Sequence, residues 1–521
     1  MKWRERHSLA VRGVVVVATY AGSAFSVETK WVLGVTMMVD KAAQNRNSWE
    51  TMVGQFVFPV VNSLYNRRGI RPAFRRALQT EKLDPEEVAA MQLEKLRQVA
   101  THAYEKVPFY RERFDQAGLR PEDIHSREDL KVLPPLEREE VIDHHHEMVI
   151  DQYRPFVHRS DLSLRGPGEP IPWARFKKNR VVRNMSSGST GSPVTFYEDG
   201  QRTALNWALG WRHRSWFGIQ PGVREVRMAR VRGLTEGRLR VPFLRKMLWS
   251  QLILLGMNLT KEDYFFCIEQ LQRFKPRVLW GITSAWVGLA EFMEEHQQSL
   301  TGWNPRLLIT WAAPLYEHEE ELLSRVFQCE VTNNYGSREV GHIAVRCPEG
   351  RYHIHDDHVL VEVDESTCQE PGEPGQILCT TLDNTVMPFI RYRIGDLGKV
   401  SHSSCSCGRP LRELDQLLGR TGDIFRTSDG RMIAPNLWCR LFMNPELESS
   451  VRRFQVVYER SGSIRFRVVR GINYDDSKEL MLIQQLRELV GTATGTSFDY
   501  VDSIEPHVSG KLLMVVREVP E

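Results

Sequence analysis

The middle of the chain alternates between short apolar runs and amphipathic stretches. The runs at 277–281 and 306–310 have the length of buried strands, whereas 261–274, 286–293 and 317–327 show helical spacing of apolar residues. Strands that alternate with helices are typical of βαβ units, in which helices cover a parallel sheet. The pattern therefore predicts an α/β domain.

A long helix is expected to begin near residue 84. Asp84 is a suitable N-cap, Pro85 suits the first helical position, and Glu86 and Glu87 favour the positive end of the helix dipole. Apolar residues then recur at helical spacing until Pro108 interrupts the pattern.

From about residue 359 the pattern changes to short strands bounded by turns, at 359–363, 375–378 and 398–400. The glycine-rich stretch Gly419–Asp423 is expected to be a tight turn at a domain boundary. The remaining tail mixes strands with one helix, which is typical of a small α+β module.

These patterns divide the chain into three parts. We predict a partly helical N-terminal extension over residues 1–85, a large α/β domain with a β-rich part over 86–419, and a small α+β domain over 420–521, whose mobility is implied only by the resemblance described below.

The composition of the chain argues against one class of function and favours one cellular location. The 521 residues include 69 basic and 66 acidic side chains, a net charge of +3, which gives no electrostatic case for nucleic-acid binding. Eight cysteines in so long a chain are too few for a disulfide scaffold, so a reducing, cytoplasmic location is the default.

The N-terminus is ambiguous. Basic residues precede an uncharged run at 13–27, which has some features of a secretory signal and is too short to span a bilayer, since about 20 apolar residues are needed. A mis-assigned start, or a segment that docks on a membrane or a complex, fits the pattern as well.

Residues 186–193 form a turn rich in serine, threonine and glycine, between the apolar-leaning run 180–185 and the strand-like run 194–197. Backbone N–H groups and hydroxyls in such a turn can wrap a phosphate, because glycine allows close approach. The lysine of the P-loop motif is missing. Taken alone, a flexible linker fits this stretch equally well.

Three further stretches carry candidate chemistry. Tyr335 and Gly336 offer a flat stacking surface, followed by the carboxylate of Glu339, which suits Mg²⁺. Asp396 lies in a predicted glycine turn, where one carboxylate can accept hydrogen bonds from two ribose hydroxyls. Lys511, near the C-terminus, can bring a point charge to a phosphate. Each also has a purely structural explanation. The stretch at 335–339 can be an ordinary loop, Asp396 a turn former and Lys511 a surface lysine.

A separate set of residues suits a metal. Cys347, His353, Cys405 and Cys407 provide three thiols and an imidazole, the ligands of a closed, structural zinc site. His355 is an alternative to His353, and free core cysteines are the alternative to zinc.

Together, the order and spacing of these motifs resemble the adenylate-forming acyl-CoA synthetase superfamily, and in detail the phenylacetate–CoA ligase family, in particular its capsular polysaccharide biosynthesis branch. The resemblance covers residues 85–521. It implies a large N-terminal domain with a rotating C-terminal lid, and an ATP-dependent enzyme. Such a ligase makes an acyl-adenylate from a small carboxylate and Mg-ATP, releases pyrophosphate, and then acylates coenzyme A.

The resemblance also assigns roles. Tyr335 and Gly336 would lie against the nucleotide, Asp396 would bind the ribose, and Arg420 would reach ribose or phosphate. Glu339 would serve Mg²⁺ and Lys511 would act in adenylation. The following residues would hold the β- and γ-phosphates or form the turn around them: Ser186, Ser187, Gly188, Ser189, Thr190 and Gly191. Some relatives carry zinc at the cysteine cluster, with a structural role.

Two departures from the family pattern concern the hinge of the lid, and with it the thiol-transfer half-reaction, and the adenine-side loop. Gly422 stands where the family usually has an acidic hinge residue, and 311–314 lacks the usual acidic residue of the adenine-side loop. Transfer to an amine or a hydroxyl, or a catalytically idle scaffold protein, therefore remains an alternative. The acyl pocket is expected to draw on 207–216, 280–284 and 311–314.

Overall fold

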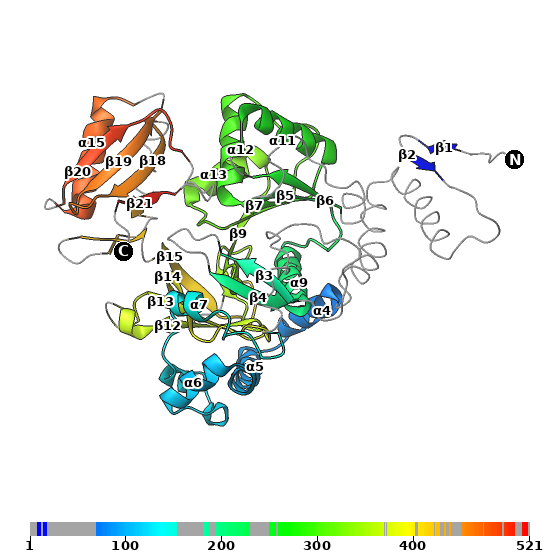
Figure 1. Ribbon diagram of the computed structural model, residues 1–521. Coiled ribbons are helices and arrows are strands. Elements are labelled where there is room, and N and C mark those ends of the chain that lie inside the picture. Colours follow the sequence, from blue (N-terminus) through cyan, green and yellow to red (C-terminus); the bar gives the residue numbers. More distant parts are fainter. Residues whose placement is uncertain are drawn as a thin grey trace, which may run out of the picture.

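The structure is a computed structural model (Figure 1). It describes residues 8–11, 14–17, 69–153, 181–186, 194–229, 250–256, 259–368, 370, 372–401, 405–420, 423–427, 432–433, 437–438, 450–471, 474–491, 494–505 and 513–518.

One large sheet organises the chain. Its strands lie in the order β12 (Val359–Asp364), β13 (Gly375–Thr381), β14 (Tyr392–Ser401), β15 (Glu413–Arg420), β11 (Tyr352–Ile354), β10 (Gly341–Arg346), β9 (Glu330–Ser337), β8 (Leu307–Trp311), β7 (Val278–Ile282), β5 (Glu225–Ala229) and β6 (Gln251–Leu255). Pairing from β6 to β9 is parallel, and from β9 to β12 it is antiparallel. The predicted α/β class with a β-rich part is confirmed, and both parts belong to one continuous sheet.

Three helices cover one face of the parallel strands (Figure 1). They are α11 (Lys261–Phe274), α12 (Thr283–Glu295) and α13 (Glu317–Phe327). The ends of α11 and α13 agree with the sequence prediction because both have clear boundary signals. Thr260 and Asp263 form a capping box at the start of α11, Glu319 accepts from the Tyr316 N–H at the start of α13, and the last residue of each helix is followed by a left-handed cap. Their apolar faces pack on the sheet around the fully buried Trp286.

The opposite face is covered by α9 (Gly200–Trp216), whose N-cap is Asp199. Trp216 packs against Val278, Leu307 and Ile309 of the sheet. Helix α4 (Ile70–Thr80) packs in turn on α9 around Trp211. The tryptophans of this stretch are therefore largely core, as their spacing indicated.

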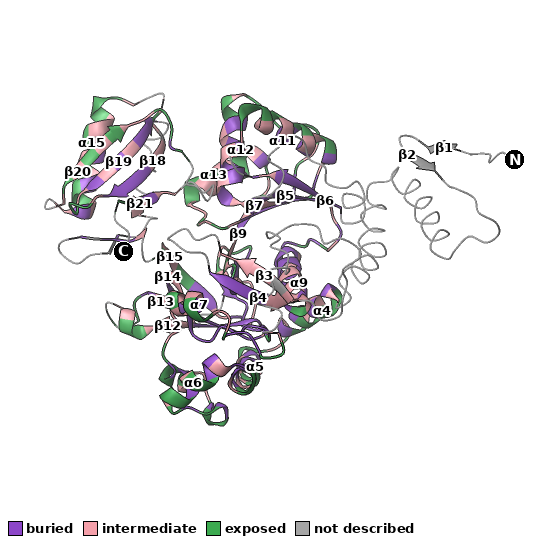
Figure 2. Cartoon of the chain, viewed as in Figure 1, coloured by how far each residue is buried: buried purple, intermediate pink, exposed green. Residues whose placement is uncertain are grey.

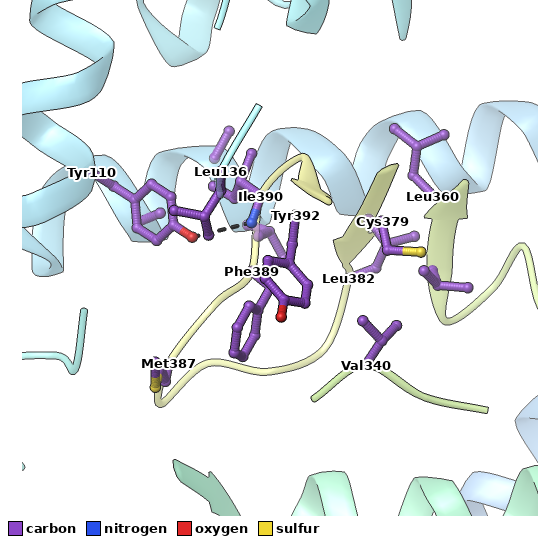
Figure 3. Close-up of a cluster of buried hydrophobic side chains, with 14 of the residues drawn as sticks. Tyr110, Leu136, Val340, Leu360, Cys379, Leu382, Met387, Phe389, Ile390 and Tyr392 are labelled. Carbon is purple, nitrogen blue, oxygen red and sulfur yellow. Dashed lines mark hydrogen bonds between the residues drawn. The ribbon is translucent and has the colours of Figure 1, made fainter. Parts of the chain in front are cut away.

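The antiparallel part packs on α5 (Pro85–Lys106) and α6 (Pro108–Ala117). Asp84 is the N-cap of α5, as predicted, and it also forms a capping box with Glu87. The Tyr110 hydroxyl donates to the Pro388 carbonyl at 2.8 Å and accepts from the Ile390 N–H at 3.1 Å (Figure 3). This buried pair of bonds fixes α6 against the loop that leads into β14.

The C-terminal part has its own sheet and core (Figure 2). Helix α15 (Asp476–Val490) packs on the four strands, which lie in the order β20 (Thr496–Tyr500), β19 (Ile464–Arg470), β18 (Val451–Tyr458) and β21 (Val515–Arg517). The division of the chain at residues 85 and 419 remains a prediction.

The other described elements are short. They are β1 (Ser8–Val11), β2 (Val14–Val17), η2 (Pro121–Asp123), η3 (Glu128–Val132), α7 (Arg138–His144), β3 (Val181–Met185), β4 (Thr195–Asp199), η5 (Glu365–Thr367), β16 (Phe425–Arg426) and β17 (Met432–Ile433). Strands β1 and β2 pair antiparallel within the N-terminal extension. Among the described residues, none of the helices is both long and apolar enough to cross a bilayer.

One local prediction was wrong and another was wrong in part. Asp396 lies inside strand β14 and not in a turn. Of the turn predicted at 419–423, Gly419 and Arg420 end strand β15, whereas residues 421 and 422 lie outside the described part of the chain. Gly395 and Gly419 have φ of 81° and 95°, and the pairing of β14 with β15 shifts register twice. The glycines therefore accommodate irregular strand pairing, which sequence cues for turns do not reveal.

The burial of a histidine makes the stability of the fold depend on pH. The ring of His213 in α9 is buried, and its Nε2 lies 3.0 Å from the Arg346 carbonyl oxygen. Burial lowers the pKa of His213 from 6.5 to about 3. Below about pH 6.5 the unfolded chain therefore binds a proton that the folded chain does not bind, and the free energy of unfolding falls until about pH 3.

We predict that His213→Gln reduces this pH dependence, because glutamine can still donate to the carbonyl but does not titrate. Between pH 6 and 4, the free energy of unfolding of the wild type should fall by about 1.4 kcal/mol per pH unit more than that of the variant. Urea unfolding at several pH values measures both slopes. The exposed His125, changed to glutamine, is the control and should leave the slope unchanged. Equal slopes in wild type and His213→Gln would contradict the prediction.

Candidate functional site

Tyr335 and Asp396 meet although three strands separate β9 from β14 in the sheet. The Tyr335 hydroxyl donates to Asp396 Oδ2 at 2.7 Å, so the sheet curls enough to bring the two strands together. Burial and the neighbouring carboxylate raise the pKa of Tyr335 well above 10, which keeps the hydroxyl protonated. Tyr335 as a whole is only partly buried, so it combines a fixed hydroxyl with accessible surface.

Gly336 is required by a close approach of two strands. A Cβ atom at this position would lie 2.2 Å from the Gly341 carbonyl oxygen of β10. Any side chain would push β9 and β10 apart and move the tyrosine beside it. The glycine thus serves the backbone packing under Tyr335, in addition to leaving its surroundings uncrowded.

Arg420 lies opposite Asp396 in the register of β14 and β15. Its Nε is 3.9 Å from Asp396 Oδ1, and about half of its side chain is exposed. A carboxylate flanked by a phenol and a guanidinium is fixed in place and remains partly open to solvent.

Glu339 lies in the turn between β9 and β10, which the Val340 N–H closes by donating to the Ser337 hydroxyl at 3.1 Å. Its carboxylate is 7% exposed and lies 3.9 Å from the guanidinium of Arg138 in α7. Arg138 also donates to the hydroxyl of Tyr392. Burial first, and then the charge of Glu339, raises the pKa of Tyr392, so this tyrosine stays neutral beside the acidic group.

Of the Ser/Gly stretch at 186–193 and the residue after it, the structure describes Ser186 and Val194. Strands β3 and β4 pair as a hairpin, and beyond them Ser186 and Val194 form a pair: the Val194 N–H donates to the Ser186 hydroxyl at 2.8 Å. Arg338 donates to the carbonyl oxygen of Met185 at 2.9 Å. The turn that carries Glu339 is therefore tied to the strand that leads into the Ser/Gly stretch.

Several predicted residues lie outside the part of the chain that the structure describes. These are Ser187, Gly188, Ser189, Thr190, Gly191, Gly422 and Lys511. Of the predicted nucleotide site, the structure places Ser186, Tyr335, Gly336, Asp396 and Arg420, together with Glu339.

The four predicted zinc ligands converge. The ligand atoms of Cys347, His353, Cys405 and Cys407 lie within 4.8 Å of one another. The sulfur atoms of Cys347 and Cys405 are 3.9 Å apart, and Cys407 Sγ is 3.2 Å from His353 Nε2. Tetrahedral zinc with its usual bond lengths needs ligand separations of about 3.4–3.8 Å, so the set fits with small adjustments.

The surroundings also suit a metal. His353 Nδ1 lies 3.2 Å from the carbonyl oxygen of Leu411, which favours the tautomer that leaves Nε2 as the ligand atom. Burial lowers the pKa of His353, so the ring is neutral at pH 7, as ligation requires. The alternative ligand, His355, contacts Arg212 and is outside the cluster.

Three tryptophans from different elements form an aromatic cluster. The rings of Trp207 in α9 and Trp280 in β7 are 6.0 Å apart, and Trp280 is 5.6 Å from Trp311 in β8. The guanidinium of Arg227 lies 4.8 Å and 5.0 Å from the rings of Trp280 and Trp311. Trp311 pairs with Asn334, next to Tyr335, so the predicted acyl-site segments lie one to two strands from the nucleotide residues.

Sequence reasoning missed Arg138 and Arg227. Neither lies in a motif, and the role of each depends on contacts with residues that are distant in the sequence. Arg138 follows a proline turn, which gives no indication of a functional role. Arg227 is one of the polar residues in an otherwise apolar strand, and this was the one feature of the sequence that could have drawn attention to it.

Comparison with known proteins agrees with this arrangement. Residues 425–518 match the family model of the CapK C-terminal domain. The chain is 26% identical over 393 residues to a phenylacetate-coenzyme A ligase of Thermus thermophilus, covering 74% of this chain and 81% of the relative. It is 22% identical over 354 residues to Protein CapK of Staphylococcus aureus, covering 66% and 76%. A 2-hydroxyisobutyryl-CoA ligase, solved in the postadenylation state with R3-HIB-AMP, has a TM-score of 0.65 at 18% identity, covering 84% and 91%.

The fold is that of the adenylate-forming CoA ligases. The resemblance inferred from the sequence is confirmed: the chain is similar to phenylacetate–CoA ligases and to CapK, and residues 425–518 match the CapK C-terminal domain.

Proposed function

We propose that the protein is an ATP-dependent ligase that converts a carboxylate to an acyl-adenylate, releases pyrophosphate, and transfers the acyl group to coenzyme A. The observation that carries the proposal is the convergence of Tyr335, Asp396, Arg420 and Glu339 beside the base of the Ser/Gly turn. The names and the fold of the relatives support it.

In this proposal each residue acts by position and charge. Asp396 accepts the ribose hydroxyls, Arg420 contacts ribose or phosphate, and Tyr335 lies against the base. The hydroxyls and N–H groups of 186–191 hold the β- and γ-phosphates, and Lys511 stabilises the charge that develops on the α-phosphate.

Two metals belong to the proposal. Glu339, a buried carboxylate in a turn that Arg338 ties to the strand before the Ser/Gly stretch, is the protein ligand for the Mg²⁺ of Mg-ATP. The cysteine cluster holds a structural zinc that ties the β10–β11 hairpin to the loop before β15, and so braces the strands that carry Asp396 and Arg420.

The substrate is an aryl or acyl acid. The aromatic cluster of Trp207, Trp280 and Trp311 favours a planar or long apolar acid, since such rings offer large flat surfaces. We further propose a cytoplasmic location, with the N-terminal extension as an attachment to a membrane or a complex.

The direct test is pyrophosphate release from Mg-ATP with a panel of aryl and acyl carboxylates, with and without coenzyme A. We expect carboxylate-dependent release, and thioester when coenzyme A is present. Adenylate that persists with coenzyme A but is consumed by an amine or a hydroxyl would assign the acceptor to the alternative class. If none of the acids causes pyrophosphate release, the proposal is contradicted.

The second candidate is the alternative left open by the sequence, a catalytically idle scaffold in a polysaccharide pathway; similarity to a protein named CapK, and not only to CoA ligases, is the observation beside it. That candidate predicts no affinity for Mg-ATP in calorimetry. Binding with a dissociation constant in the micromolar to millimolar range would exclude it.

A further inference from the structure

Arg138 is a cation for which neither the sequence motifs nor the proposed reaction provide a role. We infer that Arg138 is a phosphate-binding residue, which contacts the pyrophosphate part of the nucleotide beside Glu339. The inference rests on the proposed function, since it assumes that a nucleotide binds at this site.

The backbone that carries Arg138 is fixed to the sheet. The Leu136 N–H donates to the carbonyl oxygen of Arg391 at 2.9 Å, and the Arg393 N–H donates to that of Leu136 at 3.0 Å. Leu136 thereby forms an isolated parallel bridge with Tyr392, the first residue of β14. Because of this bridge, α7 begins at a defined point on the sheet, and its first residue faces Glu339.

The contact between Arg138 and Glu339 is loose. The nearest nitrogen and oxygen are 3.9 Å apart, which is beyond hydrogen-bond distance. Neighbouring structural pairs are tighter: 2.8 Å for Arg393 with Glu137 and 3.1 Å for Arg391 with Glu362. The guanidinium of Arg138 can therefore rotate toward a phosphate without losing a strong bond to the carboxylate.

The exposed fractions of Arg138 and Glu339 also favour a phosphate-binding role for Arg138. Glu339 is 7% exposed, whereas Arg138 is 28% exposed, so the arginine side chain remains partly open to solvent beside a buried carboxylate. Its bond to the Tyr392 hydroxyl holds the side chain near this position. A guanidinium matches the oxygens of a phosphate group in a two-bond geometry, which an ammonium group does not.

The charges of the site require a cation at this end. Glu339 and Asp396 are both acidic, and a nucleotide adds several negative charges. Arg420 lies beside Asp396, at the proposed ribose end. Arg138 lies beside Glu339, whose turn is bonded to the base of the Ser/Gly stretch through Arg338, so it serves the phosphate end.

The competing explanation is that Arg138 has only a structural role and keeps the side chains of Glu339 and Tyr392 in position. A control variant separates the two. Arg113 of α6 holds the same segment from its other side, through Glu140 and the carbonyl oxygens of Pro134 and Pro135. Arg113→Gln loosens the segment and leaves the cation of the site in place.

The experiment measures binding of magnesium pyrophosphate, Mg-ATP and AMP by calorimetry, together with thermal unfolding without ligand. We expect Arg138→Gln to weaken binding of magnesium pyrophosphate and Mg-ATP by about 10- to 100-fold, the cost of one charge-assisted pair, with AMP affinity unchanged. Arg138→Lys should recover part of the loss. Arg113→Gln should lower the unfolding temperature and keep the affinities.

Unchanged pyrophosphate affinity in Arg138→Gln would overturn the inference, as would an equal loss of affinity for all three ligands. If the wild type binds magnesium pyrophosphate through Arg138 but forms no adenylate with any acid, the inference stands and the proposed function fails. If the wild type binds none of the three ligands, both fail.

Discussion

Glu339→Gln is expected to slow acyl-adenylate formation by about 10²- to 10³-fold, the usual effect of removing one group that stabilises the charge of a transition state. The variant keeps the shape of a buried side chain that is 7% exposed and removes its charge. The amide is a poor ligand for Mg²⁺ compared with a carboxylate. Single-turnover formation of adenylate, measured by quenching and chromatography, gives the rate.

The matched control is Glu362→Gln. Glu362 is also buried, at 9% exposed, and pairs with Arg391 at 3.1 Å elsewhere on the same sheet. Its loss should lower the free energy of unfolding, because an arginine is left buried without its charge partner, and should change the adenylation rate by less than about threefold. Equal rates in Glu339→Gln and the wild type would remove Glu339 from the proposed site.

Cys405→Ser is expected to abolish zinc binding and to destabilise the large domain. Elemental analysis of the wild type should give one zinc per chain, and the variant close to none, because serine is a weak zinc ligand. Structural zinc contributes on the order of 10 kcal/mol in small domains, so a loss of several kcal/mol is expected here. Urea unfolding with and without a chelator measures it.

Cys368→Ser is the control for this change. Cys368 is a partly buried cysteine of the same sheet region, and its thiol donates to the carbonyl oxygen of Glu373 at 3.2 Å, a bond that a serine hydroxyl can replace. This variant should keep its zinc and its stability. A wild-type chain that contains no zinc after purification in zinc-supplemented medium would show that the cluster is four free side chains.

Local features of the fold were predictable because their signals lie close together in the sequence. Helices α11 and α13 agree with the prediction at both ends, since capping residues and amphipathic spacing act over a few residues. The four zinc ligands were found because thiols and imidazoles are rare enough for their spacing to carry information.

What the sequence could not reveal depends on long-range pairing. The neighbouring glycine led to the prediction that Asp396 lies in a turn, whereas strand β14 continues through it and Asp396 pairs with Arg420 of β15. The bond between Tyr335 and Asp396 joins residues 61 positions apart and arises from the curl of the sheet. Arg138 has no motif, and its position follows from the bridge between Leu136 and Tyr392.

The central claim is that one nucleotide is bound among Tyr335, Asp396, Glu339 and the Ser/Gly turn, and is attacked at its α-phosphate. The most direct measurement is the fate of ATP labelled at the α-phosphate, with an accepted carboxylate and no coenzyme A. We predict that the label appears as an enzyme-bound acyl-adenylate of about one per chain, and that Lys511→Ala forms it at least about 10²-fold more slowly. Label recovered as ADP, or adenylate formed at the same rate by Lys511→Ala, would contradict the account.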